Sequence, residues 1–255
     1  MKKDLDPTEE NELLFNIVVP VFNAEKYIEK CLNSIINQSY KRFQVQVVDD
    51  CSGDSSYEIA SSICKDKKNL KIFRNDRRIG ALNNIYNLLN SKIKEPTKTV
   101  DLIIDGDDYL YSGDVFNILK EKYIQTNCLI TYGSHISSKG VQGKKYPRLV
   151  REFNLFRKYF WYGSHLRTFR HDLWLALNPK DLLNKNQEYY SVAWDLAIML
   201  PMLEMAGNRQ EFISKVLYAY NDNNPISDHR IRRKEQILAG KEIRQKKRYK
   251  KRNFD

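Results

Sequence analysis

Short apolar runs alternate with segments whose apolar residues recur at helical spacing through the first half of the 255-residue chain. Apolar runs of this length predict buried strands, and a 3.6-residue repeat predicts amphipathic helices. The expected strands are 15–21, 43–48, 70–73, 100–104 and 128–132. The expected helices are about 24–38, one that begins near Ser55, 80–90 and 112–123. This alternation predicts an α/β fold with a mainly parallel central sheet and helices on both faces.

The second half is less regular. It has a polar loop over 133–146, an aromatic-rich segment over 152–162, expected strands at 164–170 and 212–220, and an expected helix over 189–206 that Pro201 should kink. No internal repeat divides the chain. We therefore expect an N-terminal extension over 1–14, a single domain over 15–229 with halves 15–110 and 111–229, and a tail over 230–255.

The net charge of +11 lies almost entirely in this tail. Between 230 and 252 there are 12 Lys or Arg and only two Glu, whereas residues 1–229 carry a net charge of +2. Such a tail can contact an anionic surface or partner, namely lipid, nucleic acid or acidic protein. A solvated helix or a frayed end is the alternative.

Composition narrows the class of protein. The four cysteines are widely spaced without a C-x-x-C pair, which disfavours a zinc site or a disulfide framework. The acidic segment 1–14 does not have the pattern of a secretory signal, and no long apolar run predicts a spanning helix. We therefore expect reduced thiols and a cytoplasmic location.

Carboxylates follow the expected strands at one edge of the sheet. Asp49 and Asp50 follow the second strand, and Asp105 and Asp107 follow the fourth. Ligands of parallel sheets bind outside the carboxyl ends of the strands. Two carboxylates two residues apart suit Mn²⁺ or Mg²⁺, although an Asp-Gly turn with solvated side chains is the alternative.

A basic segment, Arg74–Gly80, precedes the third expected helix. Its side chains and the amide groups at the start of that helix are suited to a diphosphate. A solvated run of charges fits the segment equally well. The Asp49–Asp50 pair has two readings as well, because it can accept hydrogen bonds from a base or ribose or can cap its own loop.

Four motifs mark the first half: Pro20–Ile28, Val48–Asp54, Arg78–Asn84 and Ile104–Asp108. In order and spacing they resemble glycosyltransferase family 2, which has the GT-A fold. The resemblance is clear over about 16–110 and looser to about 229, and it does not cover the tail. It implies that 15–110 is a nucleotide-binding half and 111–229 an acceptor half.

The resemblance also implies a site. The residues it assigns to the nucleotide sugar are Pro20, Val21, Phe22, Asp49, Asp50, Arg78, Asn84, Asp105 and Gly106. Asp107 would bind a metal at the donor diphosphate, with Asp105 and His229 as further metal ligands. Asp195 would be the catalytic base, although many relatives have Glu-Asp where this chain has Trp194-Asp195.

The function implied is a metal-dependent, inverting and non-processive transfer of a hexose, with UDP-glucose or UDP-galactose as the expected donor. The Q-x-x-R-W pattern of processive synthases is absent after Asp195. A glycan, protein or lipid would be the acceptor, and a homo-oligomer remains open. Two alternatives are a sugar-phosphate nucleotidyltransferase, although no Gly-rich loop follows the first strand, and a nucleic-acid binder that uses the tail.

Overall fold

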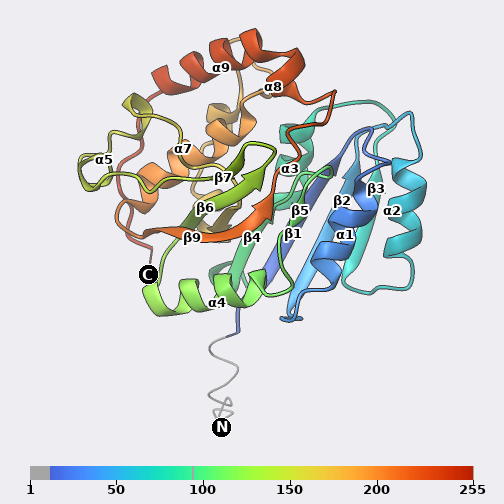
Figure 1. Ribbon diagram of the computed structural model, residues 1–255. Coiled ribbons are helices and arrows are strands. Elements are labelled where there is room, and N and C mark those ends of the chain that lie inside the picture. The colour runs from blue at the N-terminus through green and yellow to red at the C-terminus, as the bar shows by residue number, and fades with distance from the viewer. Residues whose placement is uncertain (1–11, 94, 255) are drawn as a thin grey trace.

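A computed structural model describes residues 12–93 and 95–254, except for the side chain of His229. In this part of the chain one mixed sheet has the strand order β3-β2-β1-β4-β8-β6-β9-β5, with β7 paired to β6 (Figure 1). The strands are β1 (Leu14–Val21), β2 (Phe43–Asp49), β3 (Leu70–Arg74), β4 (Thr99–Ile103), β5 (Tyr109–Leu110), β6 (Ile130–Ser137), β7 (Gly140–Gln142), β8 (Arg167–Arg170) and β9 (Gln210–Ala219).

The N-terminal half of the sheet is parallel, as the alternation of strands and helices predicts. β1 pairs in parallel with β2 and with β4, and β2 pairs in parallel with β3. Beyond β4 the sheet is mixed, because β8 lies antiparallel to both β4 and β6, whereas β6 and β9 are parallel. The carboxyl ends of β1, β2 and β4 therefore meet at one edge.

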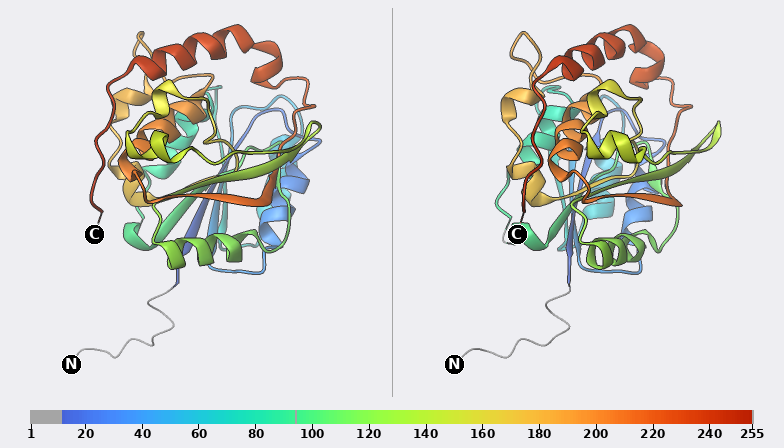
Figure 2. Two further views of the ribbon diagram at one scale, coloured as in Figure 1. Left: turned by 60° about the vertical axis from the view of Figure 1, so that its left-hand side comes forward. Right: turned by 90° about the vertical axis from the view of Figure 1, so that its left-hand side faces the viewer.

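Helices cover both faces of the sheet, as Figures 1 and 2 show. Alternate residues of β1 point to opposite faces, so that Phe15, Ile17 and Val19 join one apolar cluster and Val18 joins the other. The first cluster contains α1 (Ile28–Ile36), α2 (Ser56–Cys64) and α4 (Val115–Thr126). The second contains α3 (Ala81–Leu89), α5 (Arg148–Glu152), α6 (His171–Leu175) and α7 (Trp194–Ala206).

Some local expectations were wrong. The loop expected over 133–146 contains the end of β6 and all of β7, and β5 was missed because two residues carry no periodicity. Ser55 and Glu58 have the spacing of a capping box, but the Ser55 side chain does not cap α2. Asp54 Oδ1 accepts the Ser56 N–H at 3.0 Å instead, while Glu58 lies 3.5 Å from Arg74. The helix expected from 189 begins only at Trp194.

The basic C-terminal segment is folded onto the body. It forms α8 (Asp228–Ile231) and α9 (Arg233–Gln245), which Figure 2 shows arching over the part of the molecule that contains α7. Ile243 is buried, and Arg244 donates to the backbone oxygens of Phe156, Arg157 and Tyr159 at 2.8–3.1 Å. The expectation of a frayed end was therefore wrong, whereas that of a solvated helix holds for the outer side of α9 but not for the side that carries Ile243.

The remaining helical turns are 3-10 in type: η1 (Pro96–Lys98), η2 (Phe156–Lys158) and η3 (Pro179–Leu182). Among the described residues, every helix is too short or too polar to cross a lipid bilayer.

Candidate active site

A cavity of about 460 Å³ lies at the edge where β1 and β4 end. It collects residues from seven separate stretches of the chain. The sequence-predicted residues that line it are Pro20, Val21, Phe22, Asp50, Arg78, Asn84, Asp105, Gly106, Asp107 and Asp195. Asp49 is not part of this lining.

The turn after β4 lies directly against the end of β1. The Gly106 N–H donates to the Pro20 backbone oxygen at 3.1 Å. A Cβ at position 106 would lie 3.0 Å from Val21 Cγ2 and 3.1 Å from that oxygen. Glycine therefore lets the two strand ends approach closely, and Asp105 and Asp107 enter the cavity on either side of it.

Asp105 is paired with a buried arginine from β8. Arg167 Nη2 lies 2.5 Å from Asp105 Oδ2 and 3.0 Å from His165 Nδ1. The Arg167 guanidinium also lies over the Trp194 ring, 4.5 Å from its centroid. Arg167 therefore places a buried positive charge beside the Asp105 carboxylate in the lining of the cavity.

Asp107 is in an electrostatically unfavourable place for an isolated carboxylate. Its Oδ2 accepts from Asn224 Nδ2 at 2.7 Å. Burial raises its pKa to about 6, and the negative charge of Asp105 contributes to that increase. A positive charge placed beside Asp107 would relieve both effects.

Asp108 is buried and ties the turn to β9. Its Oδ2 accepts from the Tyr218 hydroxyl at 2.7 Å, and its Oδ1 accepts from the Asn221 N–H at 2.7 Å. Burial, followed by the charges of Asp107 and Asp105, raises its pKa well above the ordinary value. The Tyr218 hydroxyl also accepts from the Asp105 N–H at 3.1 Å, so this residue organises the whole turn.

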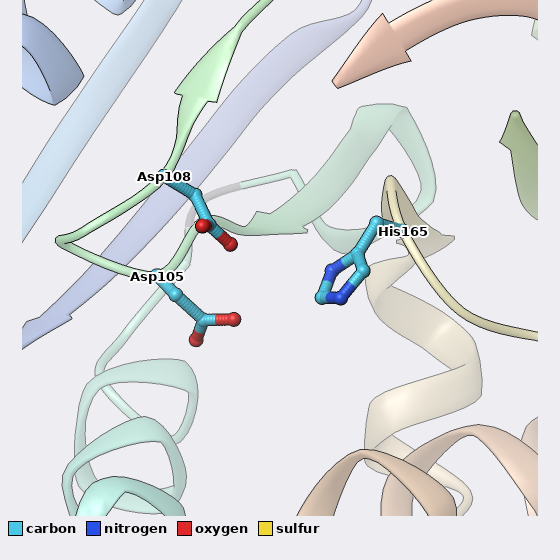
Figure 3. A group of neighbouring side chains, drawn as sticks. All are labelled: Asp105, Asp108 and His165. Carbon is cyan, nitrogen blue, oxygen red and sulfur yellow. The ribbon is translucent and has the colours of Figure 1, made fainter. Parts of the chain in front are cut away.

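Figure 3 shows Asp105 and Asp108 pointing toward the ring of His165. Each of the three residues offers one ligand atom within 4.8 Å of the others. The His165 ring is stacked between Tyr218 and Tyr220, with centroid separations of 4.9 and 4.8 Å. The turn and His165 thus bring two carboxylates and an imidazole close together, and all three are possible metal ligands.

The two neighbouring carboxylates after β2 have different environments. Asp50 accepts the N–H groups of Ile79 and Gly80 at 2.9 and 2.8 Å, and it thereby fixes the backbone before α3. Asp49 turns away from the cavity and accepts the Ser52 N–H at 3.1 Å, with Arg74 Nε at 3.5 Å. Only Asp50 of the predicted pair lies at the cavity wall.

Phe22 and Asn84 offer the cavity an aromatic ring and an unpaired amide N–H. The Arg78 guanidinium lies over the Phe22 ring, 3.7 Å from its centroid. Asn84 is buried, and its Oδ1 accepts from Asn75 at 2.8 Å. Its Nδ2 has no hydrogen-bond partner among the described residues. Because a buried amide donor is costly to leave unpaired, this atom is suited to a bound ligand.

Asp195, in the first turn of α7, lines this cavity and a second one of about 580 Å³. The second cavity is bounded by β6, β7 and the aromatic-rich segment, and it also contains Trp161, His165 and Tyr220. Trp161 Nε1 donates to Asp195 Oδ2 at 3.1 Å, which orients the carboxylate. Asp195, with His165 and Tyr220, thus lines both spaces.

Several residues of this site were not predicted: Asp108, Arg167, Tyr218 and Asn224. Their positions depend on contacts between distant segments, such as the pairing of β4 with β8. The one local signal was Asp108, which is part of the Asp-rich turn. The predicted ligand His229 has its side chain outside the described part of the chain.

The donor set fits a hard divalent cation. Such ions prefer carboxylate oxygens, and Asp105 and Asp107 bring two of these groups to the cavity. Burial and the charge of Asp105 raise the pKa of Asp107, and a bound cation would offset both effects. Asp108 is less suited, because both of its oxygens already accept hydrogen bonds.

Comparison with known proteins places this site in a family. Residues 16–182 match the model of "Glycosyl transferase family 2". Glycosyltransferase GlyA of Streptococcus pneumoniae is 30% identical over 135 residues, which are 52% of this chain and 18% of GlyA. The poly(ribitol-phosphate) β-N-acetylglucosaminyltransferase TarS of Staphylococcus aureus is 35% identical over 98 residues, which are 38% of this chain and 16% of TarS. The matches thus span less than a fifth of either relative.

Solved structures share the fold. A crystal structure of S. aureus TarS 1–349 in complex with UDP-GlcNAc superposes with a TM-score of 0.60 at 22% identity, covering 82% of this chain and 59% of that one. A mannosyltransferase from Pyrobaculum calidifontis in complex with GDP-Man and Mn²⁺ gives 0.63 at 20% identity, covering 92% and 65%. The chain therefore belongs to glycosyl transferase family 2, a family of glycosyltransferase enzymes, and has the GT-A fold.

Proposed function

We propose that the protein is a metal-dependent, inverting and non-processive glycosyltransferase, which moves one hexose from a nucleoside diphosphate sugar to an acceptor hydroxyl. The observation that carries this proposal is that Asp195 lines two adjoining cavities. A base that takes a proton from an acceptor hydroxyl must contact the acceptor and lie close to the donor.

The cavity of about 460 Å³ is the proposed donor site. The nucleoside would lie against Phe22 and Asp50, with the Asn84 amide as a further donor. Arg78 lies over the Phe22 ring and would be close to the diphosphate. The carboxylates of Asp105 and Asp107 mark the end of the cavity that we propose for the diphosphate. They belong to the turn after β4, which lies against the end of β1.

Mn²⁺ or Mg²⁺ is the proposed cofactor, held by Asp107 and Asp105, with His229 as a further candidate ligand. When bound, such an ion offsets the negative charge that develops on the departing nucleoside diphosphate. The mannosyltransferase of similar fold was solved in complex with GDP-Man and Mn²⁺. In its absence Arg167 partly neutralises Asp105.

The cavity of about 580 Å³ is the proposed acceptor site. Asp195 would accept the proton of the acceptor hydroxyl, whose oxygen then attacks the anomeric carbon. The bond from that carbon to the diphosphate oxygen breaks on the opposite face, which inverts the configuration. Trp161 holds one Asp195 oxygen through its N–H, and the other oxygen is the proposed proton acceptor.

UDP-glucose and UDP-galactose are the donors we propose first. The structures of similar fold were solved with UDP-GlcNAc and with GDP-Man, so the choice of base and sugar needs a direct test. Full-length protein with Mn²⁺ would be incubated with a panel of nucleotide sugars and scored for release of nucleoside diphosphate.

One donor of the panel should give nucleoside diphosphate that disappears on chelation of the metal. The Asp195→Asn variant is the matched control and should bind that donor without turning it over. Release of pyrophosphate from a nucleoside triphosphate and a sugar phosphate would instead identify a nucleotidyltransferase. No turnover with any nucleotide sugar, with or without candidate acceptors, would count against the proposal.

A further inference from the structure

Helix α9 has one face packed against the body. Ile243 is buried on that face. A Cβ at Gly240 would lie 3.6 Å from Leu196 Cδ2, so position 240 also faces inward. Gln236 lies at the wall of the proposed donor cavity. These residues define the inner side of the helix, and the residues about 180° around the axis define the outer side.

The outer side carries a stripe of four residues: Lys234, Ile237, Leu238 and Lys241. Their spacing of i, i+3, i+4 and i+7 places them on one helix face. Ile237 is 52% exposed and Leu238 is 66% exposed, and both lysines are exposed. No side-chain hydrogen bond or ion pair joins any of the four to another described residue. We call these four residues the α9 stripe.

The C-terminal segment that carries the α9 stripe is strongly basic, and its exposed cations on α8 and α9 are Arg230, Arg233, Lys234 and Lys241. Nine of the 12 Lys and Arg side chains between 230 and 252 are exposed. Of the two glutamates there, Glu235 is paired with Arg232 at 2.5 Å, and Glu242 is partly buried and accepts from Tyr190 and from the Lys185 N–H. Ile231, at the end of α8, adds a third aliphatic side chain with 62% exposure.

This combination favours an anionic membrane surface over nucleic acid. Phosphate groups of either partner attract the cations, but a nucleic acid backbone has no complementary group for two adjacent exposed aliphatic side chains. At a membrane interface, aliphatic side chains enter the acyl boundary while flanking lysines extend to the headgroups. The α9 stripe has this arrangement of apolar centre and basic flanks.

We propose that the α9 stripe is a docking surface for a membrane that contains anionic lipids. The helix is an interfacial one that lies on the bilayer without crossing it. Because the inner side of the same helix reaches the donor cavity, docking would bring the membrane to within about one helix diameter, roughly 10 Å, of that wall of the site. The inference does not depend on which sugar is transferred.

Co-sedimentation of the full chain with vesicles tests this proposal. Vesicles of 70% phosphatidylcholine and 30% phosphatidylglycerol would be compared with pure phosphatidylcholine at 0.1 M salt. We expect binding to the first and little to the second. Ile237→Ser combined with Leu238→Ser should lower the partition coefficient about tenfold or more. Lys234→Gln combined with Lys241→Gln should lower it by roughly 25-fold.

Matched controls come from other faces. Leu175 on α6 is 57% exposed, and Lys65 and Lys68 are exposed beyond α2, so Leu175→Ser and the Lys65→Gln, Lys68→Gln pair should bind vesicles like the parent. Thermal unfolding checks that every variant is folded. The proposal is overturned by absence of binding to anionic vesicles, by binding that the Ile237 and Leu238 changes leave intact, or by tighter binding to single-stranded RNA through the same four residues.

Discussion

Of the carboxyl groups that line the cavity, Asp107 has the pKa that its surroundings raise furthest, to about 6. Burial and Asp105 act in the same direction on its pKa, and Asn224 only partly opposes them. Asp107→Asn keeps the size of the side chain and its contact with Asn224 but removes the charge. We expect metal-dependent turnover to fall by about 10²-fold or more, measured as nucleoside diphosphate release at limiting Mn²⁺.

Near-normal turnover of Asp107→Asn under those conditions would remove Asp107 from the metal site. Asp54→Asn is a useful control, because Asp54 caps α2 outside the cavity lining. That variant should retain the parent's dependence on Mn²⁺.

The pKa of Asp107 also predicts how metal binding depends on pH. At a pKa of about 6 the carboxyl group is largely protonated below pH 6 and ionised above pH 7. Mn²⁺ must displace that proton, so the apparent Kd should rise about tenfold for each pH unit below 6 and level off above 7. Isothermal titration of the nucleotide-free protein measures this, and a Kd that is constant from pH 5 to 7 would contradict it.

Trp161 is proposed to position Asp195 through a single N–H donor. Trp161→Phe keeps an aromatic ring and removes that donor. We expect kcat to fall about tenfold, the cost of one hydrogen bond to a charged group, with the Kd for the donor unchanged. Gly163→Ala provides an independent variant, because a Cβ there would lie 2.8 Å from the Trp161 ring and displace it.

The two Trp161-directed variants should therefore lower kcat alike. A purely structural role for Trp161 would instead lower the melting temperature and weaken donor binding in parallel. An unchanged kcat in both variants would remove Trp161 from the positioning role.

At the scale of elements, the C-terminal segment is held by a buried ion pair. Arg157 Nε and Nη2 donate to Glu204 on α7 at 2.7 and 2.9 Å, and both side chains are almost fully buried. Glu204 Oε2 also accepts the Tyr249 N–H at 3.0 Å. The pair thus connects the aromatic-rich segment, α7 and the chain beyond α9.

Removal of one partner leaves a buried charge without compensation. Glu204→Ala should lower the free energy of unfolding by about 3–5 kcal/mol, measured by urea titration. Glu211→Ala on the partly exposed strand β9 is the matched control and should change it by less than about 0.5 kcal/mol. A loss below about 1 kcal/mol for Glu204→Ala would show that the pair does not anchor this segment.

The strands of the parallel half could be predicted because each is a short run rich in apolar and β-branched residues between turn residues. β5 and β7 could not, since strands of two and three residues acquire their structure from neighbours: β5 from β9 and β7 from β6. The buried face of α9 was missed for a related reason. Ile243 is one apolar residue in a basic helix, and its burial depends on α7 and η2.

At the scale of the whole molecule, the Asp-rich turn and the strand ends predicted where the cavity lies. The partners of these carboxylates were beyond sequence reasoning, because Arg167 and Asn224 are 62 and 117 residues away from the Asp residues they contact. The position of Asp195 between two cavities likewise depends on the second half of the sheet, because β6 and β7 bound one of them.

The most direct test of the account is a crystal structure of the protein with Mn²⁺ and UDP. We expect UDP in the cavity lined by Phe22, Asp50 and Asn84, with the ion about 2 Å from a carboxylate oxygen of Asp107. A nucleotide bound at another surface, or an ion held away from both Asp105 and Asp107, would contradict it.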